Sequence, residues 1–285
     1  MHQCPARQPA GYGPARSWPA HLSLQLAAGA DKTQLRGMTF TGPLRIQRPF
    51  YPEGATCHLY LLHPPGGLVS GDRLRIEVQA QAHSQSLLTT PSAGKVYRQD
   101  SAGVAQGQQV RLQLEENAEC EWLPQETIVF QGANALLDTH IELAQGARFI
   151  GWELVCLGRP AGEHWFDDGS LTQRLQLWRG GRLLFNERLQ LNAGDALHRG
   201  RAGLNGGCVF GTLLAAGPGL NDELIAGLRE TLSAGFTITE RLGVLLVRYL
   251  GSDMNDCRTG MWAAWEQLRP AVLGREASFP RIWFT

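Results

Sequence analysis

Four segments of the chain repeat one pattern: an alternating strand, a polar or glycine-containing turn, and a second strand. The segments are LRIEVQAQAHSQSLL, VRLQLEENAECEW, THIELAQGARFIGW and LQLWRGGRLLFNERL. Aligning Ile76, Leu112, Ile141 and Leu175 gives spacings of 36, 29 and 34 residues. A recurring two-strand unit predicts a stacked β architecture, either a solenoid or a sandwich. The uneven spacing leaves both alternatives open.

Helical signals enter only in the last quarter of the chain. LNDELIAGLRETL predicts a helix near residues 221–234, because Asn221 or Asp222 can cap its N-terminus. A second helix is expected over 254–268, ending before Pro270. The near-continuous apolar run in 241–251 is typical of a strand buried on both faces. The aromatic tail FPRIWFT is expected either to dock into the core or to bind another protein.

Charge and composition exclude several function classes. The 26 basic and 26 acidic residues balance, and the basic residues do not cluster with aromatic ones, so nucleic-acid binding is not expected. No apolar run reaches the length of a membrane span. Residues 1–17 read as a disordered extension without a secretory signal, followed by a single β-rich domain over 18–285. The expected compartment is therefore the cytoplasm, with reduced cysteines.

Motifs for catalysis are missing from the sequence. Gly94-Lys95 resembles part of a phosphate-binding loop, but Thr89 and Val96 occupy positions where the Walker pattern needs glycine and a hydroxyl residue. There is no GxSxG elbow and no HExxH. His58 and His63 are five residues apart, which places them on opposite faces of a continuous strand. The sequence therefore does not indicate an enzyme or a rigid metal site.

Three carboxylates occupy faces that are otherwise apolar. In LLFNERLQL, Glu187 shares its side of the strand with Leu183, Phe185, Leu189 and Leu191. Asp72, directly after Gly71, heads an apolar row, and Glu153 lies in a segment whose two faces are both apolar. A lone buried carboxylate is costly unless it is paired, hydrated or protonated. By contrast, the alternation of Glu119 and Glu121 with apolar residues predicts a solvated face.

Two interpretations of these carboxylates remain open. Asp72 can close a turn by accepting backbone hydrogen bonds, and a strand glutamate can pair with a buried arginine such as Arg159. Alternatively, several inward carboxylates line a wet internal passage, where water or a cation shares the space. A passage for a divalent ion needs ligands that hold the ion briefly and then release it.

Five long segments, together with the chain end, resemble one protein family. PLRIQRPFYPEG (43–54), CHLYLLHPPGGLVSGD (57–72), LLTTPSAGKVYR (87–98), EWLPQETIVFQGAN (121–134) and CLGRPAGE (156–163) are similar to the urease accessory protein UreD (UreH) family. The closing LRP (268–270) and PRIWFT (280–285) resemble the ends of its members. The likeness extends from about Trp18 to the C-terminus. Ser70, where many relatives have glycine, and the first seventeen residues depart from the pattern.

The resemblance implies a non-catalytic maturation factor with a mainly β, helix-like stack of strands and two α-helices. Family members bind apo-urease and UreF, and UreF recruits the GTPase UreG, so that nickel reaches the buried urease active site. An internal water-filled tunnel through the protein is also implied. No tightly bound cofactor is expected, only Ni²⁺ in transit.

Within this interpretation the three carboxylates on apolar faces acquire a role. Asp72, Glu153 and Glu187 are expected to act as transient nickel ligands, with His63 as a less certain fourth. The alternatives are an adhesive scaffold that opens urease without conducting metal, or a stand-alone β-fold enzyme that uses Asp72, Glu187 and Lys95.

Other motif residues are expected to serve structure or partner contacts. The run Pro64, Pro65, Gly66 and Gly67 predicts a rigid turn that presents a loop to a partner. Lys95, Tyr97 and Arg98 follow a turn and are candidate partner contacts. Arg159, after Gly158, is a candidate structural counter-ion.

Overall fold

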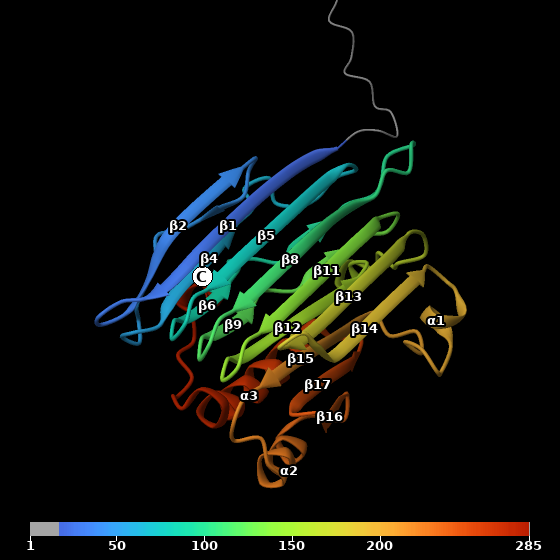
Figure 1. The fold of residues 1–285 in the computed structure, drawn as a ribbon. Helices are drawn as coiled ribbons and strands as arrows, with labels where there is room; N and C mark the ends of the chain where they lie inside the picture. Colours follow the sequence, from blue (N-terminus) through green and yellow to red (C-terminus); the bar gives the residue numbers. More distant parts are fainter. Residues whose placement is uncertain (1–16, 285) are drawn as a thin grey trace, which may run out of the picture.

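The computed structural model describes residues 17–284, whose strands form two sheets packed face to face (Figure 1). Apart from Ser17, the predicted extension over residues 1–17 lies outside the described residues. Within the described residues, no helix is both long enough and apolar enough to span a bilayer.

The first sheet contains seven strands. Their spatial order is β14 (Arg182–Asn192), β13 (Ser170–Arg179), β11 (Asn134–Leu143), β8 (Gln106–Leu114), β5 (Asp72–Ala80), β1 (Trp18–Ala28) and β2 (Thr33–Thr41).

The second sheet contains ten strands. Eight lie in the order β16 (Phe236–Arg241), β17 (Val244–Gly251), β15 (Val209–Ala216), β12 (Arg148–Leu157), β9 (Glu119–Leu123), β6 (Gln85–Thr89), β4 (Cys57–Leu62) and β3 (Arg45–Ile46). The short strands β10 (Thr127–Val129) and β7 (Gly94–Val96) extend from β12 at one side.

Successive strands alternate between the two sheets, as the turns of a coil do. The chain passes from β5 in the first sheet to β6 in the second, then from β8 to β9 and from β11 to β12. Equivalent strands of successive turns pair in parallel. Leu112 and Ile141 lie opposite each other, as aligned from the sequence, whereas Ile76 pairs with Val110, which keeps the same face. The stacked-strand architecture predicted from the repeat is confirmed.

The fourth repeat unit departs from the coil. Its strands β13 and β14 form an antiparallel hairpin within the first sheet instead of crossing to the second. The hairpin loop is Gly180-Gly181, with φ of 53° and 76°. Two consecutive residues with positive φ are what a tight hairpin turn requires, and the earlier units have longer loops that can cross the sandwich.

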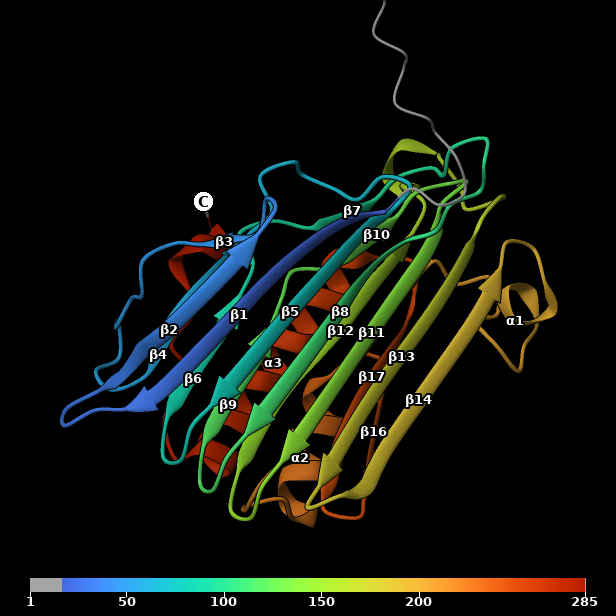
Figure 2. The same ribbon diagram turned by 45° about the horizontal axis from the view of Figure 1, so that its top comes forward.

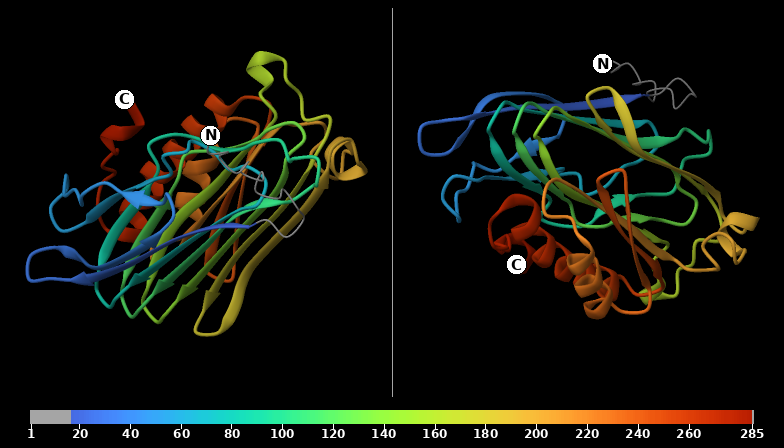
Figure 3. Two further views of the ribbon diagram at one scale, coloured as in Figure 1. Left: turned by 90° about the horizontal axis from the view of Figure 1, so that it is seen from above. Right: turned by 60° about the horizontal axis from the view of Figure 1, so that its bottom comes forward.

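Two helices cover the outer face of the second sheet. They are α2 (Asp222–Thr231) and α3 (Met254–Leu273), and Figures 2 and 3 show both on the same side of the sandwich. A four-residue helix α1 (Ala196–Arg199) follows β14, and 3₁₀ turns occur at η1 (Pro160–Gly162) and η2 (Arg281–Phe284). Because the helices cover it, the second sheet has apolar side chains on both faces.

The structure corrects several predicted boundaries. α3 does not stop before Pro270 but continues to Leu273, where Gly274 at φ 71° ends it. Proline removes one backbone donor, and this loss is tolerated here in the last turn of the helix. α2 ends at Thr231, before the expected 234. The strand expected over 241–251 starts at Val244, because the preceding residues turn back into the unpredicted strand β16.

The aromatic tail docks onto α3, which is one of its two expected fates. The Trp283 ring stacks on Trp262 with a centroid distance of 5.2 Å and an interplanar angle of 3°. Its indole Nε1 donates a 2.8 Å hydrogen bond to Thr89 Oγ1 on β6. Phe279 packs edge-on against Trp265 at 5.1 Å.

A buried arginine joins α3 to the second sheet. Arg269 is fully buried and its guanidinium donates to Glu121 on β9 at 2.9 to 3.2 Å. It also donates to Glu53 in the loop before β4, at 2.6 and 2.7 Å. His58 lies 2.5 Å from the same Glu53 carboxylate, and Trp265 Nε1 donates to Glu121 at 2.7 Å. We call these five residues the Arg269 cluster.

The Arg269 cluster overturns the solvated face predicted for two glutamates. Glu121 is 0% exposed and Glu119 is 7% exposed. Arg148 and Arg275 hold Glu119. Alternation with apolar residues resembles a wet face, but here α3 covers Glu121 and supplies Arg269, while Arg148 belongs to β12 and Arg275 follows the end of α3.

The cluster also sets the charge state of Glu53. Burial alone would raise the pKa of this carboxyl, but hydrogen bonds from His58 and Arg269 outweigh it and lower the pKa to about 2. Burial lowers the pKa of Arg269, but the carboxylates of Glu53 and Glu121 outweigh burial and raise it. The charged forms of Glu53 and Arg269 are therefore the stable ones.

We expect Arg269→Met to lower the free energy of unfolding by about 3–5 kcal/mol, because it leaves two buried carboxylates without their cation. Urea unfolding followed by tryptophan fluorescence measures the change. The matched control Arg241→Met, at an exposed position, should stay within about 0.5 kcal/mol of the parent. Equal effects of the two substitutions would contradict a stabilising role for the cluster.

Candidate functional site

Glu153 points into the space between the two sheets. Its carboxylate accepts a 2.6 Å hydrogen bond from Thr139 Oγ1 on β11 of the opposite sheet. Gln173 Nε2 on β13 lies 3.5 Å from the other carboxylate oxygen. Both neighbours are uncharged, so hydrogen bonds rather than an ion pair satisfy this glutamate.

Glu187 bridges the sheets at the β14 edge. Thr212 Oγ1 on β15 donates to one carboxylate oxygen at 3.1 Å, and Arg248 Nη2 on β17 donates to the other at 2.8 Å. The side chains of Glu187 and Arg248 are 34% and 44% exposed, so this pair lies at an opening of the sandwich.

The strand register places these groups on one line across the interior. In the second sheet Glu153 pairs with Thr212, and Thr212 pairs with Arg248. In the first sheet Thr139 pairs with Leu175, and Leu175 pairs with Glu187. We call the polar members of this line, together with the adjacent Gln173, the polar row: Thr139, Glu153, Gln173, Glu187, Thr212 and Arg248.

The two glutamates of the polar row differ in environment. Burial raises the pKa of Glu153, against the opposing effect of the hydrogen bonds from its neighbours. Protonation removes the cost of burying a charge, and it leaves the group able to exchange a proton for a cation. Glu187, by contrast, has a cation beside it. The row therefore combines a carboxyl that favours its neutral form with a carboxylate held by a guanidinium.

A cavity of about 400 Å³ opens at the Glu187 end of the row. It is lined by Glu187, Arg188, Leu189, Leu204, Phe210, Gly211, Thr212, Gly235, Thr237, Arg248, Tyr249 and Leu250. Its walls are mostly apolar, and the ion pair between Glu187 and Arg248 is the main polar feature. Water and small ions can reach Glu187 through this opening.

Asp72 lies apart from the polar row, at the first residue of β5. Its carboxylate accepts a 2.8 Å hydrogen bond from the Val69 backbone, as in the turn-closing interpretation. The register places Asp72 about four residues along the strands and two strands away from Thr139. At the usual strand rise and spacing, that separates them by about 13 Å along and about 10 Å across the sheet.

His63 is close enough to Asp72 for its ionisation to respond to that charge. Burial lowers the pKa of the imidazole, and the Asp72 carboxylate partly opposes the shift. His63 lines a second cavity, where β4 ends and β5 begins. Of the four predicted nickel-path residues, the structure therefore groups Glu153 with Glu187 and His63 with Asp72. Among the described residues, no group of three or more His, Cys, Asp or Glu side chains has metal-site geometry.

The remaining motif residues occupy defined places. Gly66 N donates to His63 O at 2.9 Å, which closes a turn through Pro64 and Pro65. The guanidinium of Arg159 lies over the Phe130 ring at 4.9 Å, so it is not the counter-ion of Glu153.

Two further motif residues make local contacts. Tyr97 packs edge-on against Phe130 at 4.9 Å, and Arg98 forms an exposed 3.2 Å ion pair with Asp168.

Sequence reasoning missed the partners of the two glutamates. Thr139, Gln173 and Thr212 are ordinary strand residues, and nothing in the sequence singles them out. Arg248 did carry a signal, because it is the only charged residue in the apolar run VLLVRYLG of β17. Arg248 lies at an exposed position of this strand, where Glu187 of β14 pairs with it.

Comparison with known proteins agrees with the likeness seen in the motifs. A family model described as UreD urease accessory protein matches residues 19–284. The chain belongs to the UreD family of urease accessory proteins. It is 44% identical to urease accessory protein UreD of Saccharophagus degradans, over 97% of this chain and 96% of that protein. It is 48% identical to urease accessory protein UreD of Marinobacter nauticus, over 95% and 94% of the two chains.

We expect Glu153→Gln to gain stability relative to the parent as the pH rises. An unfolded glutamate loses its proton near pH 4.3, whereas the raised pKa of Glu153 keeps the proton on the folded protein. Parent stability therefore falls with rising pH between these two pKa values, by up to about 1.4 kcal/mol per pH unit, and the glutamine variant lacks this loss. Urea unfolding at a series of pH values from 4 to 8 measures the difference.

The matched control for this measurement is Glu116→Gln, since Glu116 is an exposed turn residue. Its stability difference from the parent should not change over this range. A Glu153→Gln difference that is equally flat would show that the buried carboxyl is ionised throughout.

Proposed function

We propose that this protein is a non-catalytic urease maturation factor. It binds apo-urease and, together with UreF and the GTPase UreG, enables nickel insertion into the urease active site. The observation that carries the proposal is the near full-length match to urease accessory proteins, over residues 19–284. The absence of a complete Walker pattern around Lys95 agrees with a division of labour in which UreG hydrolyses GTP.

In this proposal Ni²⁺ is cargo that crosses the interior of the sandwich. The polar row supports the idea, because it places hydroxyl, amide and carboxyl oxygens between two apolar faces. Nickel binds such oxygen ligands together with water, and imidazole from His63 suits it as well. Because the oxygen donors are few and widely spaced, they hold the nickel ion weakly and favour its release, which transit requires.

Arg248 gives the proposed route a specific feature. Its guanidinium occupies the place beside Glu187 that a passing cation would take. Glu187 can then exchange one cation for another without ever being left alone in the cavity. Since the pair is partly exposed, Arg248 can move into water when the ion arrives.

A second candidate function is an adhesive scaffold that opens urease and conducts no metal. The hydrogen bonds already made by Asp72, Glu153 and Glu187 favour it, because each carboxylate has a structural role. A cytoplasmic location is also part of the proposal. It is supported by five buried cysteines in the described residues, all with free thiols.

The decisive experiment co-expresses this chain and its accessory partners with urease in nickel-containing cells. If the passage operates, Glu187→Gln and Glu153→Gln should each lower the nickel content of urease several-fold, while pull-downs still recover the complex. Asp72→Asn tests the third predicted carboxylate. The exposed control Glu116→Gln gives the nickel content expected when a carboxylate outside the passage is neutralised. Nickel is measured by elemental analysis of purified urease.

The outcomes separate the candidate functions. Full nickel content with all three charge-neutral variants would leave only the scaffold role. Normal urease maturation in cells without this chain would overturn both. Turnover of any substrate by the purified chain in the absence of urease would contradict the non-catalytic assignment.

A further inference from the structure

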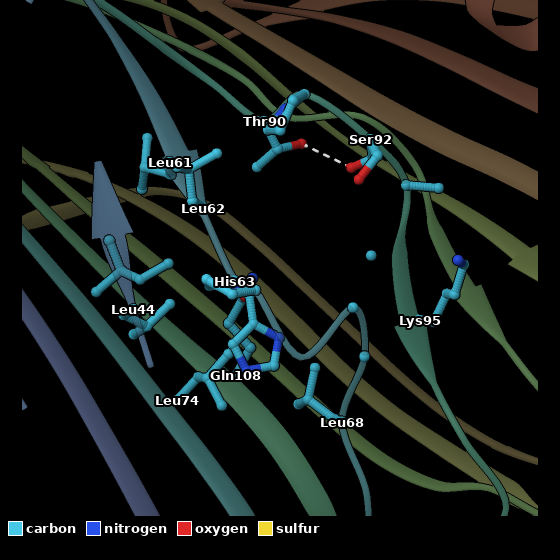
Figure 4. A pocket seen from close by; sticks show the side chains of 17 residues that line it. Leu44, Leu61, Leu62, His63, Leu68, Leu74, Thr90, Ser92, Lys95 and Gln108 are labelled. Atoms are coloured by element: carbon cyan, nitrogen blue, oxygen red, sulfur yellow. Dashed lines mark hydrogen bonds between the residues drawn. The ribbon is translucent and has the colours of Figure 1, made fainter. Parts of the chain in front are cut away.

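Two motif segments, of which the proposed function uses only His63, line a single cavity. The turn around His63 and the segment from Thr90 to Lys95 enclose about 400 Å³ at one end of the sandwich (Figure 4). Cavities of this size typically hold a small molecule or the end of a chain.

The walls of this cavity are apolar and come from both sheets. Leu74 and Ile76 of β5 contribute from the first sheet, and Leu61 of β4 contributes from the second. Leu44, Leu62 and Leu68 extend the aliphatic lining, as Figure 4 shows. An apolar ligand body would gain free energy by leaving water for this space.

A few polar groups converge on the apolar walls. Lys95 is the only permanently charged residue among the described residues that line the cavity. Gln108 adds an amide donor, whereas the Thr90 hydroxyl is already engaged, since it donates to Ser92 O at 3.2 Å and accepts from Gln125 N at 2.9 Å. The His63 imidazole also lines the cavity. Asp72, the nearby acid, is held by the Val69 backbone and does not line the cavity.

The rim is fixed before any ligand arrives. Leu68 N donates to Lys95 O at 2.7 Å, and Tyr97 N donates to Leu68 O at 2.9 Å, which ties the turn to β7. Gly67 fits only because it has no side chain, since a Cβ there would lie 2.5 Å from the Tyr97 ring. A preformed rim lowers the entropic cost of binding.

The Lys95 ammonium is available for a ligand. Across residues 17–284 it has no hydrogen-bond or ion-pair partner. Its flexible stem lets the charge swing over the mouth of the cavity.

We propose that this cavity binds a carboxylate carried on a short apolar group, with Lys95 pairing with the carboxylate and the leucines enclosing the apolar part. One cation and few donors suit a single negative charge. A phosphate would need several converging donors, and a cationic ligand would meet the repulsion of Lys95. The ligand chemistry is shared by a free aliphatic acid and by the C-terminal carboxylate of a partner chain.

The sequence makes this proposal unusually accessible to experiment, because the chain contains only two lysines, Lys32 and Lys95. Reductive methylation with ¹³C preserves their charge and gives each a separate NMR signal. Lys32 is an internal reference, since its ammonium lies 4.0 Å from the Tyr51 ring and outside the cavity. The probes are acetate, butyrate and hexanoate, with hexylamine and chloride as controls.

We expect the Lys95 signal to shift and saturate with hexanoate while the Lys32 signal stays fixed. Affinity should rise by about fourfold for each added methylene. Neither hexylamine nor chloride should give a saturable shift.

Variants followed by calorimetry with hexanoate separate charge from shape. Lys95→Gln should weaken binding by about tenfold or more, and Lys95→Arg should retain most of it. Ala93→Phe, which fills the cavity from its lining, should abolish binding while leaving Lys95 in place. The matched control Lys32→Gln should bind as the parent does.

Two peptides identify the source of the carboxylate. One ends in leucine with a free carboxylate, and the other is the same peptide amidated at its C-terminus. Tighter binding of the acid peptide than of hexanoate assigns the cavity to a chain terminus, and binding of hexanoate alone assigns it to a small acid. Binding of neither, or equal shifts of both lysine signals, overturns the proposal. None of these measurements depends on nickel transfer, so the proposed function and this inference can fail separately.

Discussion

The Arg269 cluster is the interaction on which the rest of the structure depends. It ties α3, β9 and the loop before β4 together across sequence separations of 148 and 216 residues. Each charge in it is tolerable only because the others are present. With α3 held in place, the second sheet can be apolar on both faces. A second set of buried polar groups, the polar row, lies in the space between the two sheets.

The openings at Glu187 and at Lys95 have different chemistry. At the β14 edge, a carboxylate paired with an arginine faces an apolar cavity that continues into the polar row. Where β4 ends and β5 begins, Lys95 lines a leucine-rich cavity that has no acidic residue in its described lining. Under the two proposals above, one opening exchanges cations and the other holds an anionic group.

Alternation of side chains was enough to predict the strands of the repeat units and the stacked architecture, and it drew attention to Glu153 and Glu187. It failed at Glu119 and Glu121, because α3, which covers them, comes about 150 residues later in the sequence. The hairpin at Gly180-Gly181 broke the repeat because a two-residue loop cannot carry the chain to the other sheet. The partner Thr212 carried no signal, and the pairing of Arg248 with Glu187 could not be predicted, because strand register between distant segments decides both and no local pattern encodes it.

The alternation of successive strands between the two sheets also governs how the molecule can move. Every turn of the coil connects one sheet to the other through a short loop, so the two layers cannot separate about a hinge. Under the proposed transit, an ion would therefore pass only through local rearrangement of side chains, because the layers offer no hinged opening. The size and hydration of the ion would then decide whether it passes.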